Sequence, residues 1–175
     1  MNKLLLASAI SLSVALFAAP AAQAADGTIE FTGNVTAVTC TINGGNADFN
    51  VVLPTVSAAS LATNGAVAGR TPFKIEVSGC TPDTGMISTF FEADAQVTAE
   101  GRLSIDDGGA KNVQVALLND SHNEIKLGAA GNQGSQKVSL AGGSAVLNYY
   151  AQYEATGVAE AGAVATRVRY TMSYE

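Results

Sequence analysis

The residues best suited to chemistry in this chain are its two cysteines, Cys40 and Cys80, and its single histidine, His122. A structural zinc site usually needs four nitrogen or sulfur ligands, so two thiols and one imidazole are too few to predict one. The pairing that this set favours is a disulfide between the cysteines, which is the expected state of an even cysteine count in an exported chain. A disulfide between Cys40 and Cys80 would close a loop of about 40 residues, for which the chain-entropy model predicts roughly 3–4 kcal/mol of stabilisation.

Motifs for catalysis, phosphate binding or calcium binding are incomplete in this chain. No Gly-x-Ser-x-Gly sequence marks a nucleophilic serine, and no Lys-Ser or Lys-Thr pair follows the glycine-rich segment 128–134. The segment DDGGA at 106–110 lacks the spacing and the closing glutamate of a calcium loop, so a hairpin turn is the better prediction. His122 belongs to no recognisable cluster and is expected to be a solvent-exposed loop residue. We therefore predict neither an enzyme nor a bound cofactor or metal.

The first 24 residues predict a secretory signal peptide. Lys3 gives a positive start, residues 4–19 are an apolar run, and small residues precede an expected cleavage between Ala24 and Ala25. No later apolar run approaches the roughly 18 residues that a membrane helix needs. The formal net charge of −6 and the lack of a basic run argue against nucleic-acid binding. The sequence thus predicts one soluble, exported domain.

Beyond the signal peptide, short alternating runs of apolar and polar residues are separated by turn residues. Strands are expected over 49–56, 71–80, 86–93, 101–106, 112–120, 137–140, 145–156 and 166–175. The segment 57–69 is expected to be a loop with at most one helical turn. No amphipathic helix is evident, and short strands at regular spacing indicate an all-β sandwich with Greek-key connections.

The segment 27–40, GTIEFTGNVTAVTC, alternates without a break. Its apolar face carries Ile29, Phe31, Gly33 and Val35, and its other face carries Thr28, Glu30, Thr32 and Asn34. Gly33 leaves a gap in the apolar face. A glycine inside a strand marks either a β-bulge or the close approach of another backbone, and the pattern alone leaves both open.

The last expected strand mirrors the first. Its apolar face carries Val168, Tyr170, Met172 and Tyr174, and arginines stand at 167 and 169 on the other face. The sequence offers no further strand to cover this edge, and an open apolar edge is an aggregation hazard. We therefore expect a surplus strand at the front of the domain and a vacant strand position at its back.

Several segments in the same order resemble the chaperone–usher pilins, close to the type 1 fimbrial major-subunit family. The segment 27–40 is similar to the family's G-T-[VI]-x-F-x-G-x-[VI] segment with its following cysteine, and Cys80 stands at the usual distance. NVQVALLND and YYAQYEATG resemble the family's N-V-x-[VI]-x-[VIL]-L-D and F-x-A-x-Y-x-A-T-G. Tyr174, the penultimate residue, and Gly162, the fourteenth from the end, match its C-terminal signature for chaperone recognition.

The resemblance implies an incomplete immunoglobulin-like Greek-key sandwich that lacks its final strand. A periplasmic chaperone would fill the vacant groove first, and the N-terminal extension of another subunit would replace it at an outer-membrane usher. Residues 25–38 would be this donor-strand extension and residues 39–175 the pilin domain. Ile29, Phe31, Gly33 and Val35 would enter the groove of the preceding subunit, with Gly33 where the groove floor leaves no room for a side chain. The acceptor groove and chaperone-recognition residues would be Gly162, Val168, Tyr170, Met172 and Tyr174.

The function that the resemblance implies is that of a structural subunit of a surface fimbria, a pilus shaft that supports adhesion or biofilm formation. Its partners would be identical or related pilin subunits in a head-to-tail polymer, the chaperone and the usher. The chain would be exported through the periplasm to the cell surface. Two alternatives stay open: a minor or adaptor pilin with an adhesive ligand-binding role, and a closed exported β-sandwich binding module.

Overall fold

The computed structural model describes residues 27–33, 35, 37 and 39–175. The predicted signal peptide, its cleavage site and residues 25, 26, 34, 36 and 38 of the predicted extension lie outside the described residues. The chain divides into two units, Met1–Val35 and Thr36–Glu175. In the first unit, residues 27–33 and 35 belong to no helix or strand, and Ile29, Phe31 and Val35 are 79%, 90% and 99% exposed.

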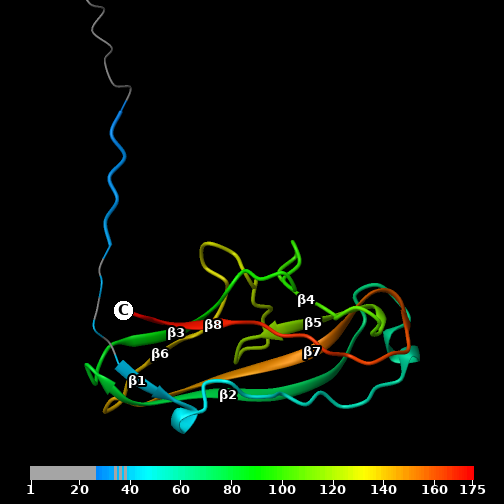
Figure 1. Ribbon diagram of the computed structural model, residues 1–175, viewed down its shortest axis with the longest axis horizontal. Coiled ribbons are helices and arrows are strands. Elements are labelled where there is room, and N and C mark those ends of the chain that lie inside the picture. Colours follow the sequence, from blue (N-terminus) through cyan, green and yellow to red (C-terminus); the bar gives the residue numbers. More distant parts are fainter. Residues whose placement is uncertain (1–26, 34, 36, 38) are drawn as a thin grey trace, which may run out of the picture. The chain divides into compact units, whose positions relative to one another are not determined.

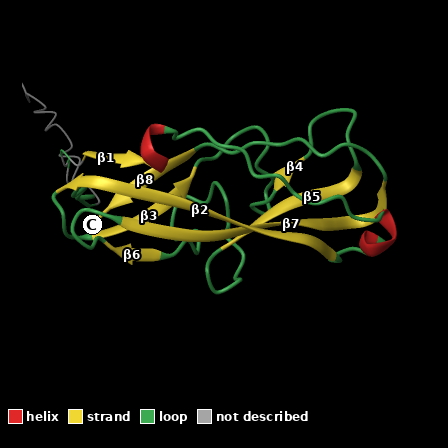
Figure 2. Ribbon diagram, turned by 90° about the horizontal axis from the view of Figure 1, so that it is seen from below, coloured by secondary structure: helices red, strands yellow, loops and turns green. Residues whose placement is uncertain are grey.

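The second unit is built from two antiparallel sheets, in which β2 and β7 are the long strands (Figures 1 and 2). One sheet has the order β1-β2-β7-β5-β4 and the other the order β6-β3-β8. The strands are β1 (Thr39–Ile42), β2 (Val67–Thr81), β3 (Met86–Phe91), β4 (Leu103–Ser104), β5 (Lys111–Leu118), β6 (Lys137–Ser139), β7 (Ala145–Glu160) and β8 (Tyr170–Tyr174). Two short 3-10 turns, η1 (Asn43–Gly45) and η2 (Ala58–Leu61), complete the described elements. The predicted all-β sandwich is confirmed.

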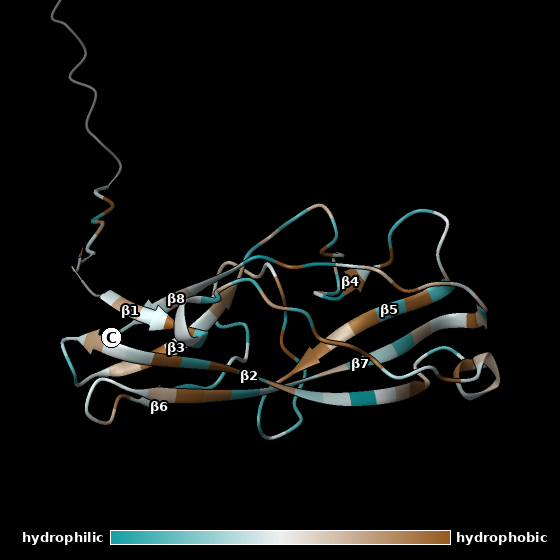
Figure 3. Ribbon diagram, turned by 60° about the horizontal axis from the view of Figure 1, so that its bottom comes forward, coloured by the Kyte–Doolittle hydropathy of each residue, from teal (hydrophilic) through white to brown (hydrophobic). Residues whose placement is uncertain are grey.

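Alternating side chains make β2 and β7 the centre of the sandwich. Ile75 pairs with Leu147 across these strands, and both side chains are buried on the inward face. The same alternation is visible as brown bands between paler and teal ones along β2 (Figure 3). Each buried side chain of this size contributes roughly 1.5–3 kcal/mol, so this row contributes strongly to the core.

A buried tyrosine links the two sheets. Tyr149 on β7 is fully buried, and its hydroxyl donates a hydrogen bond of 2.9 Å to Thr89 Oγ1 on β3. Its ring contacts Phe91 edge-on, with 5.6 Å between ring centroids. Burial raises the pKa of the Tyr149 hydroxyl, so this group stays protonated and can keep donating to Thr89.

Several segments differ from the sequence-based expectation, among them β4, which covers only Leu103–Ser104 of the predicted strand 101–106. β2 begins at Val67, because Val67 and Ala68 pair with β7, so the end of the expected loop 57–69 is strand. The expected strand 49–56 belongs to no strand or helix, and β8 is shorter than the predicted 166–175. Residues 48–55, 164, 166 and 168 have no backbone hydrogen-bond partner among the described residues, so neither segment forms a continuous ladder there.

Two turn and loop predictions agree with the structure. The Gly109 N–H donates to the Asp106 carbonyl at 3.2 Å, so DDGGA forms a turn between the antiparallel strands β4 and β5. His122 is an exposed loop residue whose ring stands edge-on to Tyr150, with 4.4 Å between ring centroids.

The Cys40–Cys80 disulfide joins β1 to β2. The bridge falls inside β2, which continues to Thr81, one residue beyond the predicted strand 71–80. β1 has only three paired positions with β2, at Thr39, Thr41 and Ile42. The covalent bridge therefore holds a strand that backbone pairing alone retains weakly.

Replacing both cysteines, in a Cys40→Ser, Cys80→Ser variant, should lower the free energy of unfolding by about 2–5 kcal/mol. Urea unfolding of the oxidised protein, the reduced protein and the variant, followed by circular dichroism, measures this loss. The reduced protein should match the variant. An unchanged unfolding midpoint in both would contradict a stabilising role for the bridge.

Candidate functional site

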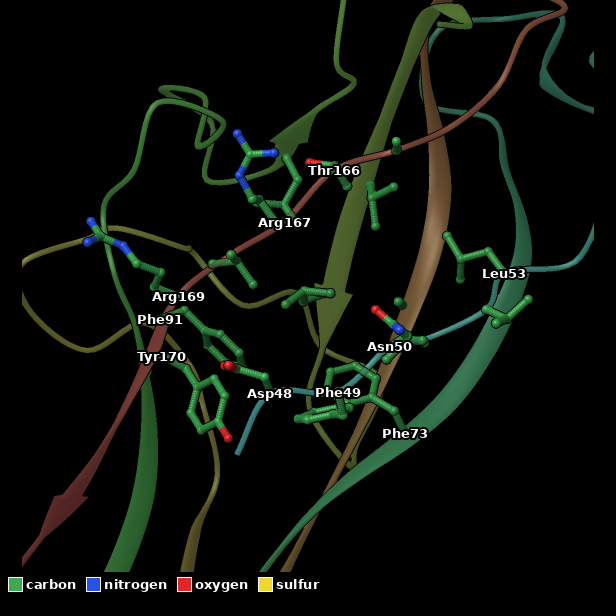
Figure 4. Close-up of a pocket in the computed structure, with 18 of the residues that line it drawn as sticks. Asp48, Phe49, Asn50, Leu53, Phe73, Phe91, Thr166, Arg167, Arg169 and Tyr170 are labelled. Atoms are coloured by element: carbon green, nitrogen blue, oxygen red, sulfur yellow. The ribbon is translucent and has the colours of Figure 1, made fainter. Parts of the chain in front are cut away.

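A groove of about 820 Å³ opens the sandwich between two extended segments (Figure 4). One side is formed by residues 47–53, here called the N-terminal bank, and the other by residues 164–170, here called the C-terminal bank. Ile42 and side chains from β2, β3, β4, β5 and β7 also line the groove: Phe73, Ile75, Phe91, Leu103, Val115, Leu117, Ala151 and Tyr153.

Side chains alternate along both banks. On the C-terminal bank, Val164, Thr166, Val168 and Tyr170 are half-buried, whereas Ala165, Arg167 and Arg169 are exposed. On the N-terminal bank, Val51 and Leu53 are half-buried and Asp48, Asn50 and Val52 are exposed; Phe49 is 39% exposed, with its ring centroid 6.2 Å from that of Phe73. Each bank therefore has the side-chain period of a β-strand, with one face toward the groove.

Most backbone groups on the edges of the banks that border the groove have no hydrogen-bond partner among the described residues. The carbonyls of Ala163, Ala165 and Arg169 accept from the N–H groups of Ala110, Asp106 and Glu92, on the side away from the groove. Among the described residues, no backbone partner is found for the alternate positions 164, 166 and 168, or for residues 48–55. Open backbone groups on two facing edges are what remains when a strand is missing from a sheet.

On β3, by comparison, a side chain provides the hydrogen bonds that the backbone of Phe91 needs. The buried Gln133 amide donates to the Phe91 carbonyl at 2.7 Å and accepts from the Phe91 N–H at 2.8 Å. On the C-terminal bank, by contrast, the Thr166 hydroxyl is buried and has no hydrogen-bond partner among the described residues. The groove therefore combines an apolar lining with polar groups that have no hydrogen-bond partner among the described residues.

The floor of the groove changes in height along its length. Next to β4 it is formed by Leu103, Val115 and Tyr153, which lie in one row of paired residues. In the next inward row, Leu117 pairs with Ala151, the smallest side chain of the floor. The C-terminal bank runs from the β4 end at Val164 to the β3 end at Tyr170, because its carbonyls meet Asp106 first and Glu92 last.

At the β3 end the two banks touch. The Tyr170 hydroxyl donates a hydrogen bond of 2.7 Å to the Ala47 carbonyl, and the Phe49 ring stands edge-on to Tyr170 at 6.3 Å. Burial, and to a smaller extent the charge of Asp48, raises the pKa of the Tyr170 hydroxyl. That group therefore stays protonated and able to donate at neutral pH.

The rim of the groove is polarised. Arg167 and Arg169 on the C-terminal bank have side chains 71% and 73% exposed, and they pair with Asp106 at 3.7 Å and Asp94 at 3.0 Å. The Ala95 N–H, helped by Arg169, lowers the pKa of the Asp94 carboxyl. In Figure 4 both arginine side chains extend away from the groove, whereas Asp48 of the other bank lies beside Phe49.

Some of the predicted acceptor residues line this groove and others lie beyond it. Val168 and Tyr170 line the groove. Met172 and Tyr174 continue the same face on β8, where they pair with Thr89 and Ile87. Gly162 comes two residues before Val164 in the chain and does not line the groove. A Cβ at this position would stand 2.5 Å from the Ala110 backbone nitrogen, so the close packing of the two backbones requires glycine there.

The N-terminal bank was not among the site residues predicted from sequence. Its alternation of Phe49, Val51 and Leu53, closed by Pro54, was visible but predicted an ordinary strand. The floor residues could not be found in this way, because they come from five different strands. In the described part of the chain, no group of three or more His, Cys, Asp or Glu side chains is arranged to hold a metal ion. None of its helices has the length and apolar character of a membrane span.

Comparisons with known proteins agree with this architecture. The family model "Fimbrial protein" matches residues 29–175. Major fimbrial subunit SMF-1 of Stenotrophomonas maltophilia (strain K279a) is 48% identical over 169 residues, covering 91% of this chain and 99% of that protein.

Two solved structures share the fold. A chaperone–usher pilus structure has a TM-score of 0.60 at 20% identity, covering 90% of this chain and 100% of its own. The P pilus rod subunit PapA has a TM-score of 0.60 at 19% identity, covering 78% and 99%. The resemblance to chaperone–usher pilins predicted from the sequence is confirmed. The chain therefore belongs to the fimbrial protein family, as a structural subunit of a surface fimbrium.

Proposed function

We propose that this chain is a shaft subunit that polymerises by donor-strand exchange. In this proposal, residues 25–38 of one copy fill the groove between residues 47–53 and 164–170 of another copy. The observation that carries the proposal is the groove itself, an apolar trough whose two facing backbone edges are largely without hydrogen-bond partners among the described residues. An added strand satisfies both edges, and its alternate side chains supply specificity.

The spacing of the donor segment matches that of the C-terminal bank. The bank presents four inward positions, at 164, 166, 168 and 170, and the segment presents four on its apolar face, at 29, 31, 33 and 35. Burial of Ile29, Phe31 and Val35, which are exposed in the structure, is worth roughly 1.5–3 kcal/mol each. The apolar face of the segment is therefore matched to the groove in both period and length.

Side-chain size favours a donor strand antiparallel to the C-terminal bank. In that direction Gly33 lies beside Thr166, near the high floor of Leu103 and Tyr153. Phe31 lies beside Val168, near the lower floor at Ala151, and Ile29 lies beside Tyr170, at the end of the groove lined by Phe73 and Phe91. The parallel direction brings Phe31 toward the high floor and leaves the space above Ala151 to a glycine.

Seating a strand also changes the β3 end of the groove. A strand between the banks separates them by two inter-strand spacings, about 9.4–9.8 Å in all. The Tyr170 hydroxyl spans the groove at this end to reach the Ala47 carbonyl at 2.7 Å, so an inserted strand competes with it for that carbonyl. The ordered strand replaces this single contact with two ladders of backbone hydrogen bonds.

Assembly requires partners that cover the groove before polymerisation. The groove exposes apolar side chains and unpaired backbone groups. The subunit therefore needs a strand from a periplasmic chaperone in the groove until the donor segment of the next subunit replaces it at the usher. A head-to-tail contact that does not close on itself generates an open fibre. The expected path is export by the signal peptide 1–24, capture in the periplasm and assembly at the cell surface.

Cells that express this chain with its chaperone and usher should carry fibres in which it is the main component. Electron microscopy of cells with and without the gene, and gels of sheared material loaded without boiling, test this. We expect a ladder of heat-resistant multiples of the subunit mass that collapses to one band after boiling in denaturant. Fibres that persist without the gene, or sheared material that contains only monomer, would overturn the proposal.

A further inference from the structure

We propose that Arg169 on the rim of the groove recognises Glu30 of the donor segment from a second copy. This inference rests on the proposed donor-strand function and adds to it a residue pair that selects the register. Glu30 is the only charged residue between positions 27 and 38, and it lies on the face opposite Ile29 and Phe31. When the apolar face enters the groove, Glu30 stays at the rim.

The antiparallel register places Glu30 directly beside Arg169. With Ile29 beside Tyr170 and Phe31 beside Val168, the residue between them lies opposite Arg169 on the outward face. Directly opposite residues on neighbouring strands have Cβ atoms about 4.5–5.5 Å apart, which suits a carboxylate–guanidinium contact. In the parallel direction Glu30 would lie opposite Ala165, which offers no charge.

Arg169 has donors left for a second carboxylate. Its Nε lies 3.0 Å from Asp94 Oδ2, and its two terminal nitrogens donate no hydrogen bond to a described residue. Arg102 of the same chain shows this division: its Nε binds Glu154 at 2.8 Å and its Nη2 binds Glu124 at 2.9 Å. A guanidinium has five N–H donors in a fixed fork, enough for two carboxylates.

Two negative charges oppose this contact: Asp94, which already pairs with Arg169, and Asp48 on the opposite bank. Asp48 is exposed and forms no ion pair with another described residue, so its side chain can turn toward solvent when Glu30 arrives. Arg167 adds a second positive charge on the bank beside Glu30. The rim therefore attracts Glu30 toward the C-terminal bank, and removal of Asp48 should strengthen that attraction.

A charge-reversal cycle in full-length fimbriae tests the pair. Fibres of wild type, Glu30→Arg, Arg169→Glu and the double variant are sheared, and the half-time of ladder collapse is measured at fixed denaturant and temperature. Each single reversal turns attraction into repulsion and should shorten the half-time about five- to tenfold. The double variant should return to within about twofold of wild type, since 0.4 kcal/mol separates such rates.

Four further single variants make the result specific. Asn34→Arg adds the same charge on the same face away from Arg169, and Arg169→Glu should not rescue it. Asp48→Asn should lengthen the half-time. Glu30→Gln and Arg169→Gln give a neutral cycle if Arg169→Glu fails to fold beside Asp94, and their two effects should be less than additive.

The outcomes separate this pair from the polymer itself. If wild-type material forms no ladder, the donor-strand function fails and the pair fails with it. If the ladder forms but its half-time is the same in both single reversals, or if the double variant is not rescued, the Glu30–Arg169 pair is wrong and the donor-strand function stands. The differences between variants should shrink in 1 M salt, where the screening length falls to about 3 Å.

Discussion

Cells that express Gly33→Leu in place of the wild-type chain should lose their fibres while keeping a folded subunit. Position 33 lies in the unit that precedes the sandwich, so a larger side chain there leaves the fold of Thr36–Glu175 intact. In the proposed register the new side chain meets the high floor at Leu103 and Tyr153 of the neighbouring copy. Overpacking a fitted core costs typically 1–3 kcal/mol, and this cost recurs at every link of the fibre.

The measurement is a count of fibres by electron microscopy together with the periplasmic level of the subunit. Thr32→Leu is the matched control, because it adds a leucine to the same segment on the face that stays outside the groove. The control should assemble, and Gly33→Leu should accumulate in the periplasm. Normal fibres from Gly33→Leu would show that this strand does not bridge subunits.

The second large effect should follow from giving the subunit its own donor strand. A copy of residues 25–38 placed after Glu175 through a linker of about four residues can fold back as a hairpin beside the C-terminal bank. The antiparallel register allows this short linker, because the copy then runs back past Tyr174 and Met172. The strand becomes an intramolecular ligand at an effective concentration in the millimolar range.

We expect this fused protein to be a soluble monomer that melts well above the unfused chain. Burial of three large side chains at roughly 1.5–3 kcal/mol each suggests a rise of more than about 10 °C for a domain of this size. Circular dichroism melting with size-exclusion chromatography measures both properties. A fusion that carries Phe31→Asp in the added copy keeps the length and should lose most of the gain. Equal melting temperatures for all three proteins, as monomers, would mean that no strand is missing.

Local alternation was enough to predict most of the strands. The runs at 71–80, 112–120 and 145–156 became parts of β2, β5 and β7, because residues two apart face one core. The start of β2 was missed, because Val67–Gly69 is rich in small residues and its strand character comes from pairing with β7. Such pairing depends on residues far away in the sequence and leaves no local pattern.

The candidate site was only half predictable for the same reason. The C-terminal bank was found because Val168 and Tyr170 continue an alternating run, and the resemblance to pilins explained its purpose. The height of the floor depends on Ala151 and Tyr153, whose different sizes matter only once β7 lies under both banks. Gly162 shows a different limit of prediction from sequence. The resemblance linked this residue to chaperone recognition, but the structure also requires glycine there because the Ala110 backbone packs against it.

The position of the Cys40–Cys80 disulfide has a mechanical consequence for a fibre built in this way. Tension along the fibre would enter each subunit through its donor segment and reach the sandwich first at β1, which has only three paired positions with β2. The bridge at Cys40 passes that force directly to β2, whose pairing with β7 extends from Val67 to Val77 and is loaded along its length. A pull on the donor segment is therefore resisted by the covalent bridge and the long β2–β7 pair, and no longer by the three paired positions of β1 alone.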